Sequence, residues 1–151
     1  MRNGIYTYFR SYHLRLNTIR DDDENVVIYF DGKDCPFLDF EVSKHHQDAY
    51  CLIIRLSELN NAYWAKTYTL YKGFKLLLFE LNIGIEGMVS IATSDNQAFS
   101  ELGLTEIDKS WFAQDIHISN LENIWEERSP ALGLSMPEGL KGKVFIKPYA
   151  D

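Results

Sequence analysis

The sequence predicts an α+β fold, in which a single domain over residues 1–151 holds a mainly antiparallel sheet and a few short helices concentrated in the C-terminal half. The length of 151 residues suits one domain. Stretches typical of strands fill the first part of the chain, where 15 of the 21 aromatic residues lie within residues 1–80. Most helix-start signals come later. Strands followed by helices indicate an α+β fold and argue against a doubly wound nucleotide fold, in which the two would alternate.

The first strands are expected near the N-terminus. Residues 5–16 alternate between apolar and polar side chains, which predicts a sheet with one packed face, and Arg10 on the apolar parity predicts a bend or an edge. Residues 26–30 form a second strand that runs into Asp31 and Gly32. Because this dipeptide favours a type I′ turn, residues 37–42 are expected to return as the hairpin partner.

The middle of the chain adds further strands. Residues 50–56 are typical of a buried strand, and residues 57–64 are expected to form a short helix. Residues 68–79 form a hairpin candidate that turns at residues 72–73. Residues 88–93 predict one more strand after a glycine turn.

Helices are expected in the last third. Residues 94–103 combine a capping side chain with a terminal glycine, and residues 105–108 are expected to begin another helix. Residues 119–128 begin with the capping-box pattern S-N-L-E and carry apolar residues at helical spacing, and Pro130 would stop this helix. Residues 143–146 predict a closing strand.

The charge is acidic and unevenly distributed. The chain holds 15 basic and 22 acidic residues, a net charge of −7, which argues against binding to nucleic acid or anionic membranes and favours a basic protein partner. Residues 76–127 carry ten acidic residues and one lysine, and residues 21–24 are all acidic. Glu122, Glu126 and Glu127 are expected on the outward side of the predicted helix over residues 119–128.

These acidic residues, with an exposed aromatic anchor, form the predicted partner-binding surface. Interfaces favour aromatic side chains inside a polar rim, and opposite charge speeds encounter. The aromatic side chains expected on the surface are Trp111, Phe112 and Tyr149. The predicted partner-binding residues are Asp21, Asp22, Asp23, Glu24, Asp115, Glu122, Glu126, Glu127 and Trp111.

The sequence contains no nucleophile elbow, phosphate loop or dinucleotide fingerprint, so an enzyme is not expected, and no cofactor or metal is predicted. The alternative enzyme is a small hydrolase or metal-dependent enzyme that uses His45, His46 and Asp48. His13 and His117 have no evident titratable partner and are expected to be surface or satisfied residues. A third hypothesis is a regulatory module whose sheet presents tyrosines to a small molecule.

The compartment is expected to be the cytoplasm. No signal peptide or apolar membrane span is evident, and the two cysteines do not form a disulfide framework. Cys35 and Cys51 are therefore expected to be reduced, although a bridge between them stays open.

The chain is short, carries an acidic stretch from Glu80 to Glu127, is rich in aromatic residues and lacks catalytic motifs. In these features it resembles the small immunity proteins of bacterial toxin systems, including those of contact-dependent growth inhibition. This resemblance implies a tight one-to-one complex with a cognate toxin domain, often a basic nuclease. It implies inhibition by steric and electrostatic occlusion, without turnover. These proteins share no single fold, so the resemblance transfers no site residue.

Overall fold

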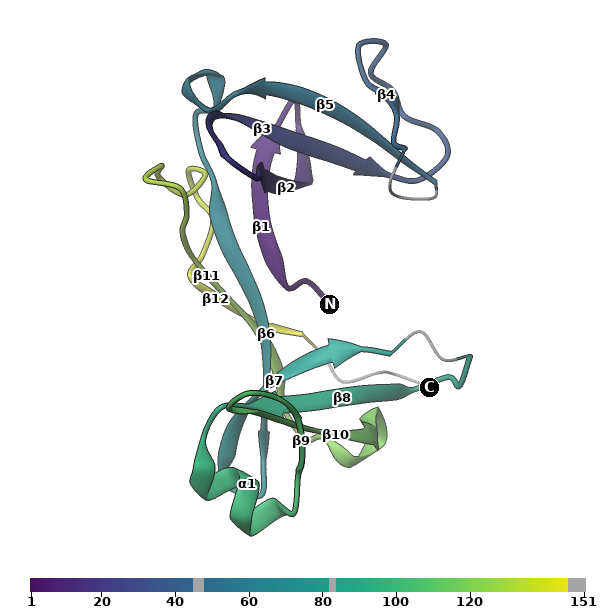
Figure 1. The fold of residues 1–151 in the computed structure, drawn as a ribbon, viewed down its shortest axis with the longest axis vertical. Coiled ribbons are helices and arrows are strands. Elements are labelled where there is room, and N and C mark those ends of the chain that lie inside the picture. Colours follow the sequence, from purple (N-terminus) through teal and green to yellow (C-terminus); the bar gives the residue numbers. More distant parts are fainter. Residues whose placement is uncertain (45–47, 82–83, 147–151) are drawn as a thin grey trace. The chain divides into compact units, whose positions relative to one another are not determined.

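The computed structural model describes residues 1–44, 48–81 and 84–146, and these residues form mostly antiparallel strands with one α-helix (Figure 1). The chain divides into two units. Unit 1 contains residues 1–3, 65–128 and 141–146, and unit 2 contains Gly4–Trp64 and Ser129–Leu140. The prediction of a mainly antiparallel sheet is confirmed, but the described residues hold fewer helices than expected. One domain over the whole chain stays a prediction.

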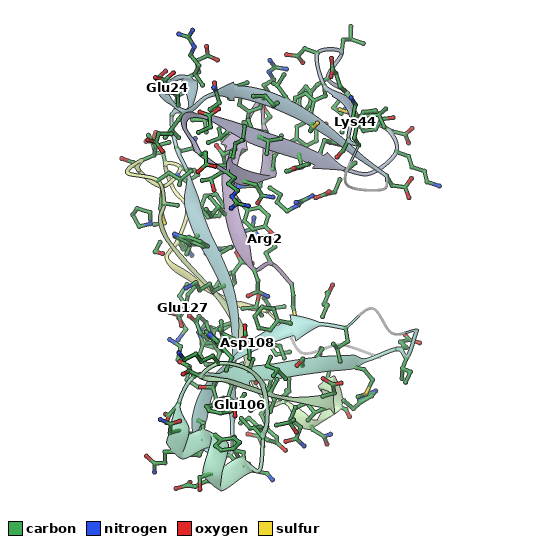
Figure 2. All side chains as sticks on the ribbon, in the orientation of Figure 1. Arg2, Glu24, Lys44, Glu106, Asp108 and Glu127 are labelled. Atoms are coloured by element: carbon green, nitrogen blue, oxygen red, sulfur yellow. The ribbon has the colours of Figure 1, made fainter. Side chains whose placement is uncertain are left out.

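Unit 2 is built on a sheet with strand order β4-β5-β3-β2-β1, in which each neighbouring pair is antiparallel. Glu24 lies in β3, and Lys44 follows β4 (Figure 2). The element bounds are β1 Gly4–Phe9, β2 Tyr12–Ile19, β3 Asp22–Asp31, β4 Glu41–Val42, β5 Ala49–Arg55 and the 3₁₀-helix η1 Leu56–Glu58.

The bend expected at Arg10 is a two-residue hairpin turn. Arg10 and Ser11 have φ angles of 49° and 71°, and the strands pair with Thr7 opposite Leu14. Because of this register, odd-numbered residues of β1 share a face with even-numbered residues of β2. Thr7 is therefore buried, whereas Tyr8 is exposed, and the continuous parity expected over residues 5–16 is wrong within β1.

Two other expectations for unit 2 are corrected. The hairpin between residues 26–30 and 37–42 does not form, because β3 pairs with β2 and β5, while the short strand β4 pairs only with β5 in the described residues. The helix expected over residues 57–64 is reduced to η1, and Tyr63 already begins the next strand.

Unit 1 contains the strand order β12-β11-β6-β7-β8-β10-β9. The predicted hairpin over residues 68–79 and the strands over residues 88–93 and 143–146 are confirmed. The element bounds are β6 Tyr63–Tyr71, which starts in unit 2, β7 Phe74–Glu80, β8 Met88–Thr93, α1 Asn96–Leu102, β9 Thr105–Asp108, β10 Trp111–His117, the 3₁₀-helix η2 Ile118–Asn120, β11 Ile124–Pro130, which ends in unit 2, and β12 Lys143–Ile146.

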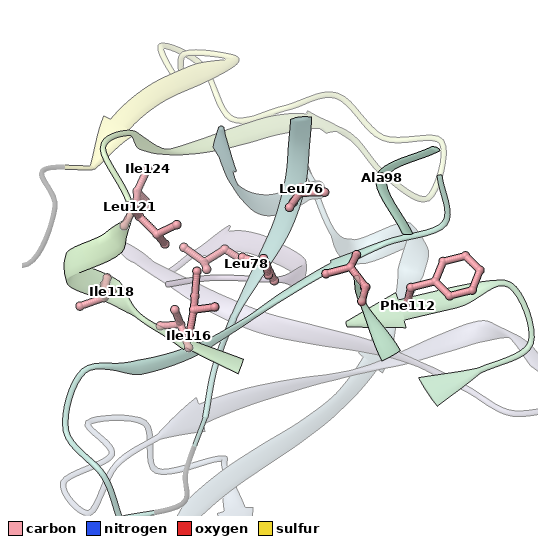
Figure 3. Packing of buried hydrophobic residues seen from close by; sticks show 11 residues of the cluster. Leu76, Leu78, Ala98, Phe112, Ile116, Ile118, Leu121 and Ile124 are labelled. Atoms are coloured by element: carbon pink, nitrogen blue, oxygen red, sulfur yellow. The ribbon is translucent and has the colours of Figure 1, made fainter. Parts of the chain in front are cut away.

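The core of unit 1 lies on one face of this sheet (Figure 3). Leu78 pairs with Ile91, so their side chains project to the same face, and Ala98 from α1 packs against the same cluster. Phe99 stacks on Phe112 at 4.1 Å between ring centroids. Burial of each large aliphatic side chain contributes about 1.5–3 kcal/mol to stability, so this layer holds the sheet and α1 together.

Helix α1 confirms the predicted caps. Asp95 accepts a hydrogen bond from the backbone N–H of Gln97 at 2.8 Å, and Gly103 ends the helix with φ 68° and ψ 37°. These are the N-cap and left-handed C-terminal conformations that the two residue types favour.

The helix predicted over residues 119–128 is wrong. Ser119 does not cap a helix, because its hydroxyl lies 2.7 Å from Nδ1 of His117. Ile124 and Trp125 instead pair with Ile146 and Phe145 in the β11–β12 ladder. The helix expected from residue 105 is also wrong, since residues 105–108 form β9. In residues 124–127, pairing with β12 overrides the local helix signal, and residues 105–108 form a hairpin with the adjacent strand β10.

Candidate protein-binding surface

The acidic segment at residues 21–24 begins in the tight turn between β2 and β3 and continues into the start of β3. Asp22 accepts hydrogen bonds from the backbone N–H groups of Glu24 and Asn25 at 2.9 and 3.0 Å, and from Asn25 Nδ2 at 3.0 Å. The Asn25 side chain, followed by these backbone groups, lowers the pKa of Asp22. Asp22 thus stabilises the start of β3, whereas Asp21, Asp23 and Glu24 are exposed.

Glu126 does not face outward as predicted, and only 4% of it is exposed. Its carboxylate accepts hydrogen bonds from Arg2, with Nε at 3.2 Å, and from Arg128, with Nε at 2.6 Å. Burial raises the pKa of Glu126, but the hydrogen bonds from the two arginines outweigh it, so the pKa lies below its usual value. Glu126 is therefore an ionised anchor inside unit 1 and adds nothing to an exposed acidic surface.

Glu127 is also neutralised within the chain. Its Oε2 atom accepts hydrogen bonds from Lys75 Nζ and Trp125 Nε1, both at 2.7 Å. Burial raises the pKa of Glu127, and the hydrogen bonds from Lys75 and Trp125 lower it by more. Glu127 thus belongs to a local ion pair next to the Trp125 ring.

Glu122 keeps the exposure that the sequence predicted, although no helix carries it. It lies in the loop between η2 and β11 and makes no ion pair in the part of the chain that the structure describes. This loop borders an open groove of about 610 Å³. The residues that line it are Leu70, Tyr71, Lys72, Gly73, Asn120 and Glu122.

The clearest exposed acidic surface lies at the β9 edge of unit 1, which we call the β9–β10 surface: residues 105–108, Trp111 and Asp115. Every residue of β9 is exposed, including Ile107 at 63%. Asp108 pairs with Trp111, which is 38% exposed, and Glu106 pairs with Phe112. Glu106 and Asp108 are labelled in Figure 2.

Asp115 is also exposed and lies further along β10, beyond the point between Trp111 and Phe112 where the register with β9 shifts. Glu106, Asp108 and Asp115 make no ion pair with any described residue. The surface thus combines exposed apolar side chains with uncompensated negative charge. Sequence reasoning proposed Trp111 and Asp115 but missed Glu106, Ile107 and Asp108, because it placed residues 105–108 in a helix.

The other two aromatic side chains expected on the surface have different outcomes. Phe112 is buried in the core of unit 1 beneath Phe99, so this expectation is wrong. Tyr149 lies outside the described residues.

The proposed histidine site cannot be assembled from the described residues, because His45 and His46 lie outside them. Asp48 is exposed and has φ 57° just before β5. No group of three or more potential metal ligands occurs among the residues that the structure covers. Cys35 and Cys51 are both free thiols.

His13 contacts Tyr63, a contact that the sequence does not predict. Its Nδ1 lies 2.6 Å from the hydroxyl of Tyr63, a fully buried residue, and its ring lies 4.8 Å from the ring of Tyr8. The two hydrogen-bonded residues are 50 positions apart, so no local pattern in the sequence indicates the pair. His13 also borders an open hollow of about 290 Å³, shared with Tyr8 and residues 137–140.

A family model described as uncharacterised conserved protein UCP033725 matches residues 1–132. The chain belongs to this family. The match includes the whole β9–β10 surface and ends before β12. Comparisons with curated proteins and with solved structures give no match. Among the described residues, no helix has the length and apolar character needed to cross a membrane.

Proposed function

We propose that the chain is an acidic protein-binding inhibitor of the immunity-protein type, which acts in the cytoplasm by occluding a basic partner domain. The proposal rests on the β9–β10 surface, where three exposed carboxylates that make no ion pair with a described residue lie on the same two strands as exposed Trp111 and Ile107. Aromatic anchors within a polar rim are typical of protein interfaces. Uncompensated carboxylates would attract a basic surface and speed its association.

This surface replaces the one that the sequence indicated. Glu126 and Glu127 are bound to arginine and lysine side chains of unit 1, so they offer little charge to a partner. A carboxylate that already accepts strong hydrogen bonds would have to lose them before it could bind elsewhere, at a cost of several kcal/mol for a buried pair. Glu122, Asp21, Asp23 and Glu24 stay accessible as additional contacts.

The test compares two charge-reversal variants. One replaces Glu106, Asp108 and Asp115 by lysine, and the matched control replaces Asp34, Glu58 and Glu138, exposed acidic residues of unit 2, by lysine. Both change the net charge equally. The tagged chain is used to capture proteins from lysate of its own cells, and each captured protein is then purified and titrated.

We expect a basic protein whose affinity falls at least about tenfold, or about 1.4 kcal/mol, with the β9–β10 variant and much less with the control. Inhibition of that protein's activity by an equimolar amount of the chain would support occlusion. Equal loss in both variants would show that net charge alone matters. Capture that the β9–β10 reversal leaves unchanged would contradict the proposed surface.

A second candidate function, a small-molecule-binding module, is favoured by one observation in unit 2. The face of its sheet opposite the core carries a mostly apolar groove of about 410 Å³, within the usual range for ligand pockets of about 300–1,000 Å³. The residues that line it are Ile19, Val27, Tyr29, Glu41, Val42, Ser43, Lys44, Cys51 and Ile53. A thermal-shift screen tests this function, with Ile53→Asp as the variant that should abolish any stabilisation by a ligand of this groove.

A further inference from the structure

The sheet of unit 1 has two open edges. Within the described residues, β9 pairs only with β10, and β12 pairs only with β11, at opposite ends of the strand order. An edge strand presents a row of unpaired backbone N–H and C=O groups, which another strand can extend. The side chains of β9 are exposed, as are those of Lys143, Val144 and Phe145 in β12, so both edge strands lie at the surface of unit 1.

The two edges carry opposite charge. β9 reads Thr105-Glu106-Ile107-Asp108, with two carboxylates that make no ion pair in the described part of the chain. β12 reads Lys143-Val144-Phe145-Ile146, and exposed Lys141 precedes it. The first edge is therefore acidic, and the second is basic.

The basic edge is also apolar and ordered. Phe145 is 67% exposed, and Nζ of Lys143 lies 5.0 Å from its ring centroid and 4.8 Å from that of Trp125. These cation–π contacts keep the Lys143 charge at the edge instead of leaving it on a freely moving side chain. Ile107 provides a matching exposed apolar residue on the acidic edge.

Charge decides which edges can pair. Two β9 edges would bring carboxylates together, and two β12 edges would bring lysines together, and like charges opposite one another destabilise a strand pair. Pairing β9 with β12 brings acidic residues close to lysines and covers apolar side chains of both strands. We propose that unit 1 associates head to tail, with β12 of one copy of this chain adding to β9 of a second copy.

The net charge of −7 opposes this association only at long range. At about 0.15 M ionic strength, exposed charges farther apart than about 8 Å are largely screened, whereas neighbouring strands lie about 4.8 Å apart. The local attraction between the edges therefore outweighs the overall repulsion. Each edge strand has four residues, so the interface is small and the association is weak.

Head-to-tail contact uses two different surfaces, so it forms a ring if the rotation closes and an open row if it does not. The contact requires no other protein and does not depend on the proposed function. A basic partner bound to the β9–β10 surface would compete with the second copy for the same edge.

The test is sedimentation velocity of the purified full chain over a wide range of protein concentration. The acidic-edge variant carries Glu106→Lys and Asp108→Lys, and the basic-edge variant carries Lys141→Glu and Lys143→Glu. A control carries Asp23→Lys and Glu24→Lys in unit 2. Circular dichroism of each variant shows whether it is folded.

The wild type and the control should gain mass with concentration, and each edge variant alone should stay monomeric. An equimolar mixture of the two edge variants should associate again, because each presents the charge that the other's opposite edge needs. Loss of folding in one variant cannot produce this restoration. The proposal is overturned if the wild type stays monomeric up to about 1 mM, or if the mixture of folded edge variants does not associate.

Discussion

At the scale of single residues, the decisive side chain is Glu126. The sequence places it among exposed acidic residues, but the structure buries it between Arg2 and Arg128. Arg2 is 124 positions away in the chain, so the pairing is a property of the fold. A carboxylate that the sequence assigns to a partner instead joins the N-terminal residues to β11.

Glu126→Ala should lower the free energy of unfolding by about 3–5 kcal/mol, because it leaves two partly buried guanidinium groups without their counter-charge. Urea unfolding measures this loss. Glu122→Ala is the matched control, since Glu122 is exposed and unpaired in the described structure, and it should change stability by less than about 0.5 kcal/mol. Equal losses in the two variants would show that the Glu126 ion pairs stabilise nothing.

The contribution of Glu126 should depend on pH. Its pKa in the folded chain lies below the ordinary value of 4.5, so its ionised form is favoured by folding. The stabilisation is therefore complete above pH 4.5 and is lost as the pH falls through the folded-state pKa. The difference in unfolding free energy between wild type and Glu126→Gln should shrink in acid. A difference that stays constant or grows in acid would contradict this assignment.

At the scale of elements, residues 118–130 contain a local helix signal, but Ile124–Pro130 form a strand instead. The capping-box pattern is present, but an isolated helix of this length is marginal, and most of its stability would have to come from packing. In β11, Ile124 and Trp125 are buried and pair with β12 at the same time. The strand therefore satisfies both the backbone and the apolar side chains of this segment.

Two glycines with positive φ allow the cost of a strained backbone to be separated from the cost of a steric clash with a neighbouring side chain. Gly103 has φ 68°, and a Cβ added there would meet open space, whereas Gly87 has φ 79° and an added Cβ would lie 2.4 Å from Nε2 of His117. Gly103→Ala should cost about 1–2 kcal/mol for the left-handed conformation alone. Gly87→Ala should cost more, because the His117 ring is hydrogen-bonded to Ser119 and must move.

Urea unfolding of both variants measures the difference between these two costs. Adding His117→Ala to Gly87→Ala should recover the part that comes from the collision, after correction for His117→Ala alone. If Gly87→Ala is no more destabilising than Gly103→Ala, then the ring moves at no cost and the collision is not a constraint.

At the scale of the whole molecule, the net charge of −7 does not say which carboxylates are paired and which are exposed, and the fold determines this. Glu126 and Glu127 form internal ion pairs with Arg2, Lys75 and Arg128. Other carboxylates, at the β9 edge, have no such pair within the described residues. The acidic character that the sequence places on one helix face is therefore carried by a sheet edge instead.

Association with the proposed basic partner should slow steeply as salt is added, because screening weakens attraction between exposed charges. Stopped-flow mixing at several salt concentrations measures the association rate constant. The variant with lysine at Glu106, Asp108 and Asp115 should show a shallower salt dependence than the unit 2 control. The same slope for both would locate the steering charge outside the β9–β10 surface.

Elements held by signals within a few residues were predictable. The hairpin over residues 68–79 and helix α1 depend on a turn glycine and on caps next to their own ends. Strands β8 and β12 follow from their apolar residues. The pairing of β3 with β5 was not predictable, because a favourable turn at Asp31 and Gly32 says nothing about which distant strand competes for the same edge.

Composition and local patterns in this chain thus account for an acidic, sheet-rich molecule, for its tight turns and for its one capped helix among the described residues. The fold alone settles which carboxylates are neutralised, which strands lie at the edges and which aromatic side chains stay exposed. Turns and caps arise from contacts between near neighbours in the chain, which a sequence records directly. Ion pairs and sheet edges arise from contacts between remote residues, whose positions depend on every other strand in the sheet.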